Sequence, residues 1–271
     1  MEKQSNDARK PKKQHSAPAR NWVGDNGKII EPLFADYFLS LHPMRCFQGR
    51  LFTVDGMIED EAPLKKEIYE QIRYYAPTSV ARRIEHIMQA IKLACASEPP
   101  EIQMDRIHVR NGTYFADGHF TPEKEYCMNR LPIAYVSDAP APTRWLQFLN
   151  ELLYEEDIPA LQEYIGYCLL PVTKAQKMLL MVGKGGEGKS RIGLILRELF
   201  GSSMYTGSLQ KVETNRFARA DLEYKLLLVD DDMKTEALPQ TNNIKTLVTL
   251  EDKIDIERKG QHSVQGTLYV R

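Results

Sequence analysis

An octapeptide at residues 183–190 has the residue types and the spacing that a triphosphate-binding loop requires. It reads GKGGEGKS and fits the pattern Gly-x-x-x-x-Gly-Lys-Ser. Its glycines let successive backbone N–H groups point at phosphate oxygens, Lys189 can reach the outer phosphates, and the hydroxyl of Ser190 can ligate magnesium. The predicted nucleotide-binding residues are therefore Gly183, Lys184, Gly185, Gly186, Glu187, Gly188, Lys189 and Ser190.

The sequence around this loop predicts the elements that would position it. An apolar run of strand length precedes it at residues 178–182, and residues 190–200 carry apolar side chains at helical spacing before Gly201, a predicted helix stop. A strand, a glycine loop and a helix in this order place the loop at a helix N-terminus, which favours anions. The alternative, a glycine-rich turn with an accidental lysine, is disfavoured because these elements accompany the motif.

Three consecutive carboxylates supply a candidate acidic partner. The apolar residues 226–229 run directly into Asp230, Asp231 and Asp232, about forty residues after Lys189. We expect a buried parallel strand that emerges at its carboxyl edge, with room for one helix and one intervening strand between the two motifs. Strand geometry favours Asp230 and Asp231, of which one would hold magnesium through water while its neighbour acts as general base. The alternative is a solvated acidic turn.

A hairpin with a basic tip follows. Residues 253–257 alternate in polarity, Arg258, Lys259 and Gly260 form a turn, and residues 264–270 return as a second strand. The tip could contact a phosphate backbone, although an ordinary hairpin with a solvated tip is the alternative.

Composition bounds the organisation of the 271 residues. Residues 1–20 have a net charge of +4 and no apolar periodicity, which predicts a basic disordered tail. Residues 21–171 carry a net charge of −8, which disfavours a nucleic-acid site over that whole region, and residues 172–271 carry +3. We therefore predict domains at 1–20, 21–171 and 172–271.

The region 21–171 is predicted to be mainly helical. Apolar residues at helical spacing indicate helices over 80–95, 145–153 and 158–169, and turn signals at Asn111-Gly112 and Asp117-Gly118 indicate a small β meander. The cysteines form no Cys-x-x-Cys pair, and no apolar run approaches the roughly 20 residues that span a bilayer. Reduced thiols, a cytoplasmic location and no membrane contact are the expectations.

These features together resemble superfamily 3 helicases of the phage and plasmid primase-helicase type, with the poxvirus primase-helicase as a more distant cousin. The resemblance covers residues 22–271 and lies in the two nucleotide motifs together with Asn111-Gly112, Trp145, 162–167, Asn215-Arg216-Phe217, Asp221-Leu222, 247–249, Asp252 and 257–260. The phosphate loop alone is shared by many ATPases, whereas the ordered set is more specific.

The resemblance implies an α/β fold with an AAA+-like P-loop core built on a parallel sheet, preceded by the helical region. It also implies ATP and Mg2+ as cofactors, a hexameric ring with ATP between subunits, and channel hairpins that pull single-stranded DNA. Carried over to this sequence, Lys189 and Ser190 bind ATP and magnesium, and Asp231 and Asp232 serve hydrolysis. Lys259, with Arg258 beside it, is the DNA contact. Asp231 is favoured by both the strand geometry and the resemblance.

The family pattern continues beyond the hairpin with a strand that ends in a polar sensor, usually Asn, and then an arginine finger. This chain stops at residues 268–271, so we expect a C-terminally incomplete core that binds ATP, hydrolyses it poorly and forms rings weakly. No zinc motif and no carboxylate pair spaced like a primase centre is found.

The leading hypothesis is an ATP-dependent DNA helicase module that acts in replication of a phage, plasmid or integrated element. A helicase loader or a small-molecule kinase is an alternative, and a GTPase is disfavoured because no Asn-Lys-x-Asp motif occurs. The non-enzyme alternative is a hydrolysis-deficient fragment that binds DNA or a partner.

Overall fold

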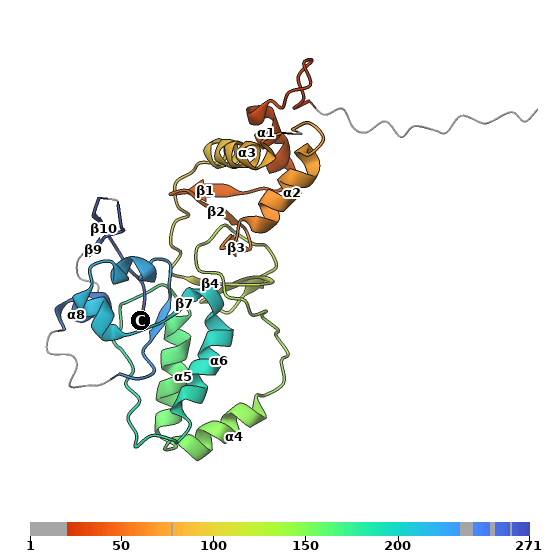
Figure 1. Cartoon of the computed structure of the whole chain (residues 1–271). Coiled ribbons are helices and arrows are strands. Elements are labelled where there is room, and N and C mark those ends of the chain that lie inside the picture. Colours follow the sequence, from red (N-terminus) through yellow and green to blue (C-terminus); the bar gives the residue numbers. More distant parts are fainter. Residues whose placement is uncertain (1–20, 77, 234–240, 250–252, 261) are drawn as a thin grey trace, which may run out of the picture. The chain divides into compact units, whose positions relative to one another are not determined.

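The computed structural model describes residues 21–271 apart from 77, 234–240, 250–252 and 261 (Figure 1). The predicted basic tail at residues 1–20 and Asp252 of the family pattern lie outside the described residues. Contacts divide the chain into two compact units. One holds the described residues up to Leu51 together with Ile58–Ser97, and the other holds Phe52–Met57 and Glu98–Arg271.

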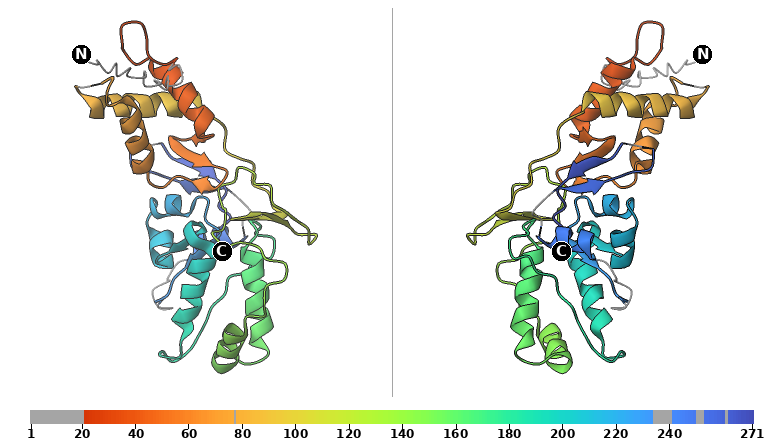
Figure 2. Two further views of the ribbon diagram at one scale, coloured as in Figure 1. Left: turned by 90° about the vertical axis from the view of Figure 1, so that its right-hand side faces the viewer. Right: turned by 90° about the vertical axis from the view of Figure 1, so that its left-hand side faces the viewer.

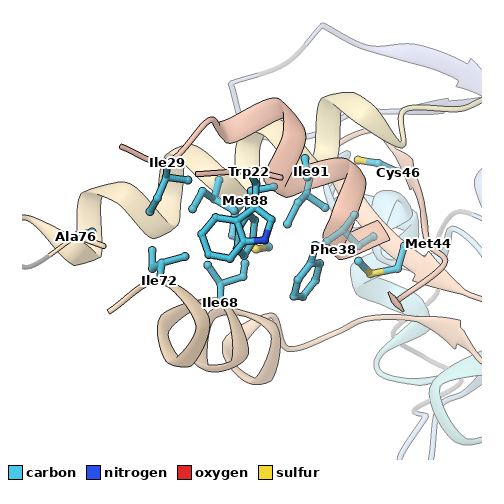
Figure 3. Packing of buried hydrophobic residues seen from close by; sticks show 14 residues of the cluster. Trp22, Ile29, Phe38, Met44, Cys46, Ile68, Ile72, Ala76, Met88 and Ile91 are labelled. Atoms are coloured by element: carbon cyan, nitrogen blue, oxygen red, sulfur yellow. The ribbon is translucent and has the colours of Figure 1, made fainter. Parts of the chain in front are cut away.

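The first unit is built on helices α1 (Glu31–Leu41), α2 (Ala62–Ile72) and α3 (Val80–Ala94). Both α1 and α2 have a proline in the first turn, where its missing N–H is not needed. Ile87, Met88 and Ile91 lie on one face of α3 and are buried, which confirms the predicted amphipathic helix. Figure 3 shows Met88 and Ile91 near Trp22. The ring centroid of Trp22 lies 4.9 Å from that of Phe34 in an edge-on arrangement.

A small sheet in this part of the chain differs from the expected, mainly helical structure. Strands β1 (Arg45–Phe47), β2 (Arg50–Thr53) and β3 (Gly56–Met57) form it in that order. The turn between β1 and β2 has positive φ angles at Gln48 and Gly49, 49° and 76°, as a two-residue hairpin requires. Strands of two to four residues are too short to show a period of two in the sequence.

The second unit contains the predicted meander, formed by the antiparallel strands β4 (Arg106–Val109), β5 (Gly112–Phe115) and β6 (Phe120–Thr121). Gly112 is required by close approach, because a Cβ there would lie 2.0 Å from the carbonyl oxygen of Thr121. The guanidinium of Arg130 is buried beside the meander and donates to the carbonyl oxygens of Val54, Val109, Gly112 and Glu125. The four hydrogen bonds that the guanidinium donates offset the free-energy cost of burying its charge.

Helices α4 (Thr143–Leu152), α5 (Asp157–Cys168) and α6 (Lys189–Phe200) confirm the remaining helix predictions. Figures 1 and 2 show α5 and α6 next to each other, with α4 beyond one end of α5. The three helices share an apolar core with β7 (Met204–Thr206) and β8 (Leu227–Val229), centred on Leu149, Leu161, Ile192, Leu196, Phe200, Met204 and Leu227. Gly201 ends α6 with a positive φ of 51°.

The described elements do not show the predicted P-loop core on a parallel sheet, but they include one parallel pair of strands. Strands β7 and β8 pair in parallel, with Met204 opposite Leu227 and Thr206 opposite Val229. The last residues run beside β8, because Leu228 N donates to Arg271 O at 2.6 Å and Arg271 N donates to Leu226 O at 3.0 Å. The described elements are therefore mixed α/β with small sheets.

The prediction of a strand at residues 178–182 is wrong. The segment has no regular secondary structure, all five side chains are exposed, and Val182 is 93% exposed. An apolar run indicates a strand only when a neighbouring strand accepts and donates its backbone hydrogen bonds, and none of the described strands pairs with this segment.

A third apolar cluster joins α7 (Leu209–Thr214), α8 (Asn242–Thr249) and β9 (Ile254–Ile256) with the 3-10 turn Ala218–Leu222. The remaining strand is β10 (Val264–Gly266). Strands β9 and β10 pair antiparallel, with Ile256 opposite Val264, which confirms the predicted hairpin with shorter strands. Leu222, Ile254, Ile256, Leu268 and Val270 are buried in this cluster.

The compact units divide between Ser97 and Glu98, whereas the predicted boundary between 171 and 172 falls inside the second unit. The assignment of functional domains stays a prediction. All four cysteines are free thiols. Within the part of the chain that the structure describes, no helix is both long and apolar enough to cross a membrane.

Candidate phosphate-binding site

The glycine loop leads into a helix where the sequence predicts it. Helix α6 begins at Lys189, and Gly188 precedes it with a φ of 106°. Gly185 and Gly186 also have positive φ angles, 94° and 76°, which glycine adopts without a steric penalty. Phe148 of α4 lies beside Gly188, 3.5 Å from where a Cβ would stand. The loop therefore has the curled backbone of the motif.

The hydrogen-bond donors of this loop converge on the carboxylate of Glu187. The backbone N–H of Lys184 donates to Oε1 at 2.9 Å, and Lys189 Nζ lies 2.6 Å from Oε2. Lys189, and after it the Lys184 N–H, lower the pKa of Glu187. A Cβ at Gly183 would lie 2.0 Å from Glu187 Oε2, so a larger residue there would displace this carboxylate.

This donor set fits a phosphate group. A backbone N–H and an ammonium that bind the two oxygens of one anionic group are the partners that phosphates take at helix N-termini. The carboxylate of Glu187 stands in for such an anion, because it occupies the donors that a phosphate would use. Lys184 and Lys189 would therefore hold the phosphates of a nucleotide, and Glu187 would have to turn away.

One residue from each predicted half of the site, Ser190 and Asp231, lines a common cavity. This cavity of about 330 Å³ lies among α6, β7 and β8 and is bounded by Ser190, Arg191, Gly193, Leu194, Arg197, Met204, Thr206, Val229 and Asp231. Ser190 is the predicted metal ligand from the loop, and Asp231 is the favoured carboxylate after β8. Residues about forty positions apart in the chain thus share one cavity in the second unit.

The three aspartates after β8 have different surroundings. Asp230 Oδ2 accepts from Leu209 N at 2.8 Å and Oδ1 accepts from Asp232 N at 3.3 Å, so this carboxylate holds the start of α7. Asp231 is exposed on the cavity wall, and Asp232 is exposed outside the set of lining residues. The geometry thus favours Asp231 for a metal, and the catalytic roles of Asp231 and Asp232 stay predictions.

Within the described part of the chain, the aspartates do not belong to a preformed cluster of metal ligands. Among the described residues, no group of three or more His, Cys, Asp or Glu side chains could hold a metal ion. Magnesium, however, binds through one or two protein ligands together with substrate phosphates and water. Ser190 and Asp231 would suffice for such a site.

The two basic residues at the hairpin tip are placed differently. Arg258 forms an ion pair with Glu223, and the two side chains are only 21% and 12% exposed. Lys259 is exposed in the turn next to Gly260, whose φ is 75°. Neither residue lines the cavity of Ser190 and Asp231. Lys259 is thus the one of the pair that is open to a ligand.

Sequence reasoning predicted Glu187 only as a nucleotide-binding residue and missed two further charged groups at this site. Glu187 stands at a variable position of the loop pattern, so its role as an internal anion has no sequence signal. Arg191 and Arg197 line the cavity. The i, i+3, i+4, i+7 spacing of Ser190, Gly193, Leu194 and Arg197 could have identified this face of α6.

Two family models match separate parts of the chain. Residues 40–153 match the family model described as D5 N terminal like, and residues 181–271 match a family of unknown function, DUF5906. Each model covers less than half of the chain, so the two matches show similarity to these families and no more. No curated protein is similar enough to count as a relative.

Two solved structures of the NrS-1 C terminal region, both apo, are partly similar to the chain at 15% identity. The similarity to one of them extends over 89% of this chain and 56% of the NrS-1 chain, with a TM-score of 0.48. The other, the A form, covers 82% and 49% with a TM-score of 0.47. The chain spans about half the length of these structures, and so weak a likeness does not identify a shared function.

Proposed function

We propose that this chain carries the nucleotide site of an ATP-dependent DNA helicase module that acts in phage replication. The observation that carries this proposal is the placement of Ser190 and Asp231 on one cavity, together with a loop whose donors converge on one carboxylate group. A cavity that joins a phosphate loop to a carboxylate after a parallel strand is the arrangement that nucleoside triphosphate hydrolysis uses.

Each residue has a role that follows from its chemistry. The ammonium of Lys189 and the backbone N–H of Lys184 would hold the outer phosphates, replacing their contacts with Glu187. Ser190 and Asp231 would hold magnesium, which when bound would neutralise phosphate charge. Asp232, the neighbour of Asp231, would orient and deprotonate the attacking water. Lys259 would contact the DNA backbone without regard to sequence.

The proposal is tested by ATP turnover with and without single-stranded DNA. Lys189→Ala should abolish ATP binding and turnover, because it removes the charge that faces the phosphates. Lys184→Ala is the matched control, since its contribution comes from the backbone N–H, which the substitution retains. Turnover that DNA stimulates and that only Lys189→Ala abolishes supports the proposal. Unchanged nucleotide affinity in Lys189→Ala would refute the assignment of the loop.

A second candidate is nucleotide binding with little hydrolysis. The exposed run at residues 178–182 favours it, because the phosphate loop is then not anchored to a sheet strand. Catalysis requires donors held in fixed positions, whereas binding tolerates a mobile loop. Calorimetric binding of ATP without measurable turnover would select this candidate, and DNA-independent turnover would select another ATPase, such as a helicase loader.

A further inference from the structure

A second pocket of the second unit lies away from the phosphate loop and has no assigned ligand. Its accessible volume is about 70 Å³, and it is walled by residues 100–103, β4, 127–129 and the segments 223–226 and 267–269. It borders Leu226, just before β8, whereas Asp231 follows β8. The pocket and the phosphate-binding cavity therefore lie at opposite ends of this strand and share no lining residue.

Two buried polar atoms at this pocket lack hydrogen-bond partners among the described residues. They are Nδ1 of His108 and Oε1 of Gln103, and both residues line the pocket. His108 is only 3% exposed. A buried polar atom without a partner is destabilising, so two of them on residues that line one pocket indicate a missing ligand.

The charge state of His108 limits what that ligand can be. Burial, and then the nearby charge of Arg130, lower the pKa of His108 from 6.5 to about 4. The imidazole is therefore neutral at pH 7, with one donor and one acceptor nitrogen. Glu101, Glu223 and Lys225 also border the pocket, and Glu223 is paired with Arg258. A neutral imidazole suits an uncharged group with donors and acceptors on one edge.

The rings at the pocket indicate that this group is planar. Tyr224 and Tyr269 both line it. Tyr224 has a φ of 63°, a left-handed conformation that a bulky residue adopts only when the surrounding structure imposes it. Aromatic side chains beside amide and imidazole groups are the partners that unpaired nucleobases use. The small volume favours one ring over two.

We propose that this pocket binds a single unpaired pyrimidine base. Gln103 Oε1 accepts a hydrogen bond from an N–H of the base, and the neutral imidazole of His108 pairs with the same edge. Tyr269 packs against the face of the ring. The inference rests on the proposed function only for the single-stranded DNA that would present the base, and a free nucleoside is the other source of the same chemistry.

The test is binding without any adenine nucleotide, so it does not depend on ATPase activity. Calorimetry compares oligo-dT, an abasic oligonucleotide of equal length, and free thymidine. The abasic strand presents the same phosphates without bases. We expect oligo-dT to bind at least fivefold more tightly than the abasic strand, since each stacked base adds about 1–3 kcal/mol. Competition by thymidine would identify the base alone as sufficient, and its failure would identify the strand as the source.

Two variants locate the base. Gln103→Met removes the acceptor at similar size and should weaken oligo-dT binding about fivefold, and Tyr269→Ala should weaken it at least as much. Gln210→Met, an exposed residue of α7, is the matched control and should have no effect. Unfolding curves show that each variant folds.

Two results would overturn the proposal. One is equal affinity for oligo-dT and the abasic strand, or no binding of either base-containing ligand. The other is loss of oligo-dT binding in Lys189→Ala together with full binding in Gln103→Met, which would place the base contact at the phosphate loop. Loss of ATP turnover with unchanged oligo-dT binding would count against the proposed function and not against base binding in this pocket.

Discussion

Among single residues, Glu187 gives the sharpest link between geometry and function. Its carboxylate takes both the ammonium of Lys189 and the backbone N–H of Lys184. The loop pattern predicts the glycines, Lys189 and Ser190, because each has a fixed physical task. It leaves position 187 open, so the internal ion pair could be found only from side-chain positions.

Glu187→Gln should raise the affinity for ATP about twofold to fivefold, as expected for the loss of an exposed ion pair that competes with phosphate. The change keeps the size of the side chain and removes its charge. Calorimetric titration with ATP measures the effect. Glu198→Gln on the exposed side of α6 is the control, and lower ATP affinity in Glu187→Gln would mean that the carboxylate assists binding instead.

His108 predicts a pH dependence of stability. Its folded-state pKa of about 4 lies below the ordinary 6.5, so the unfolded chain takes up the proton first as the pH falls. The stabilisation is complete above about pH 6.5 and is lost progressively toward pH 4. From pH 7 to pH 5, this group should lower the free energy of unfolding by about 2 kcal/mol.

Urea unfolding of wild type and His108→Asn at these two pH values isolates the effect. The variant should lose less stability than wild type over this range, while His119→Gln, at an exposed histidine, should behave like wild type. An equal loss in His108→Asn and wild type would show that His108 is not buried as a neutral group.

Among the elements, those with a long apolar period were predictable. Helices α3, α5 and α6 and the strand β8 follow the sequence pattern because their apolar faces form the cores. The short strands β1–β3 gave no signal, and residues 178–182 gave a misleading one. Apolarity records a tendency to be buried, whereas a strand also needs a hydrogen-bonded neighbour. The parallel order of β7 and β8 brings Asp231 to the α6 cavity, as expected.

The β9–β10 hairpin carries one cation that is held in an ion pair, Arg258, and one that is exposed, Lys259. Arg258→Ala leaves the largely buried carboxylate of Glu223 without its partner and should destabilise the fold by about 1–3 kcal/mol. Lys259→Ala should leave stability unchanged and weaken binding of single-stranded DNA, with a smaller salt dependence.

Thermal unfolding and DNA titration at two salt concentrations distinguish these outcomes. Lys253→Ala, an exposed cation of the same hairpin, is the control. Equal loss of DNA and ATP affinity in Lys259→Ala would show that Lys259 is structural and would argue against a DNA contact at the tip.

The whole molecule has two compact units with cores of their own. The core around Trp22 and Phe38 belongs to the first unit, and the clusters around Ile192 and Leu222 belong to the second. Both predicted nucleotide motifs lie in the second unit, where residues 181–271 match one family model. The order of motifs along the chain was readable from sequence, but their meeting on one cavity depends on long-range packing of α6 against β7 and β8.

The proposal that Ser190 and Asp231 hold one magnesium ion is tested most directly by a double-mutant cycle on Mg2+-ATP binding. Ser190→Ala and Asp231→Asn are measured by calorimetry alone and together, with and without Mg2+, and Asp221→Asn serves as an exposed control. If both residues hold one metal, each variant loses the Mg2+-dependent part of the affinity and the double variant loses little more, so the effects are not additive. Fully additive effects, or an unchanged Mg2+ dependence in both variants, would contradict a shared site.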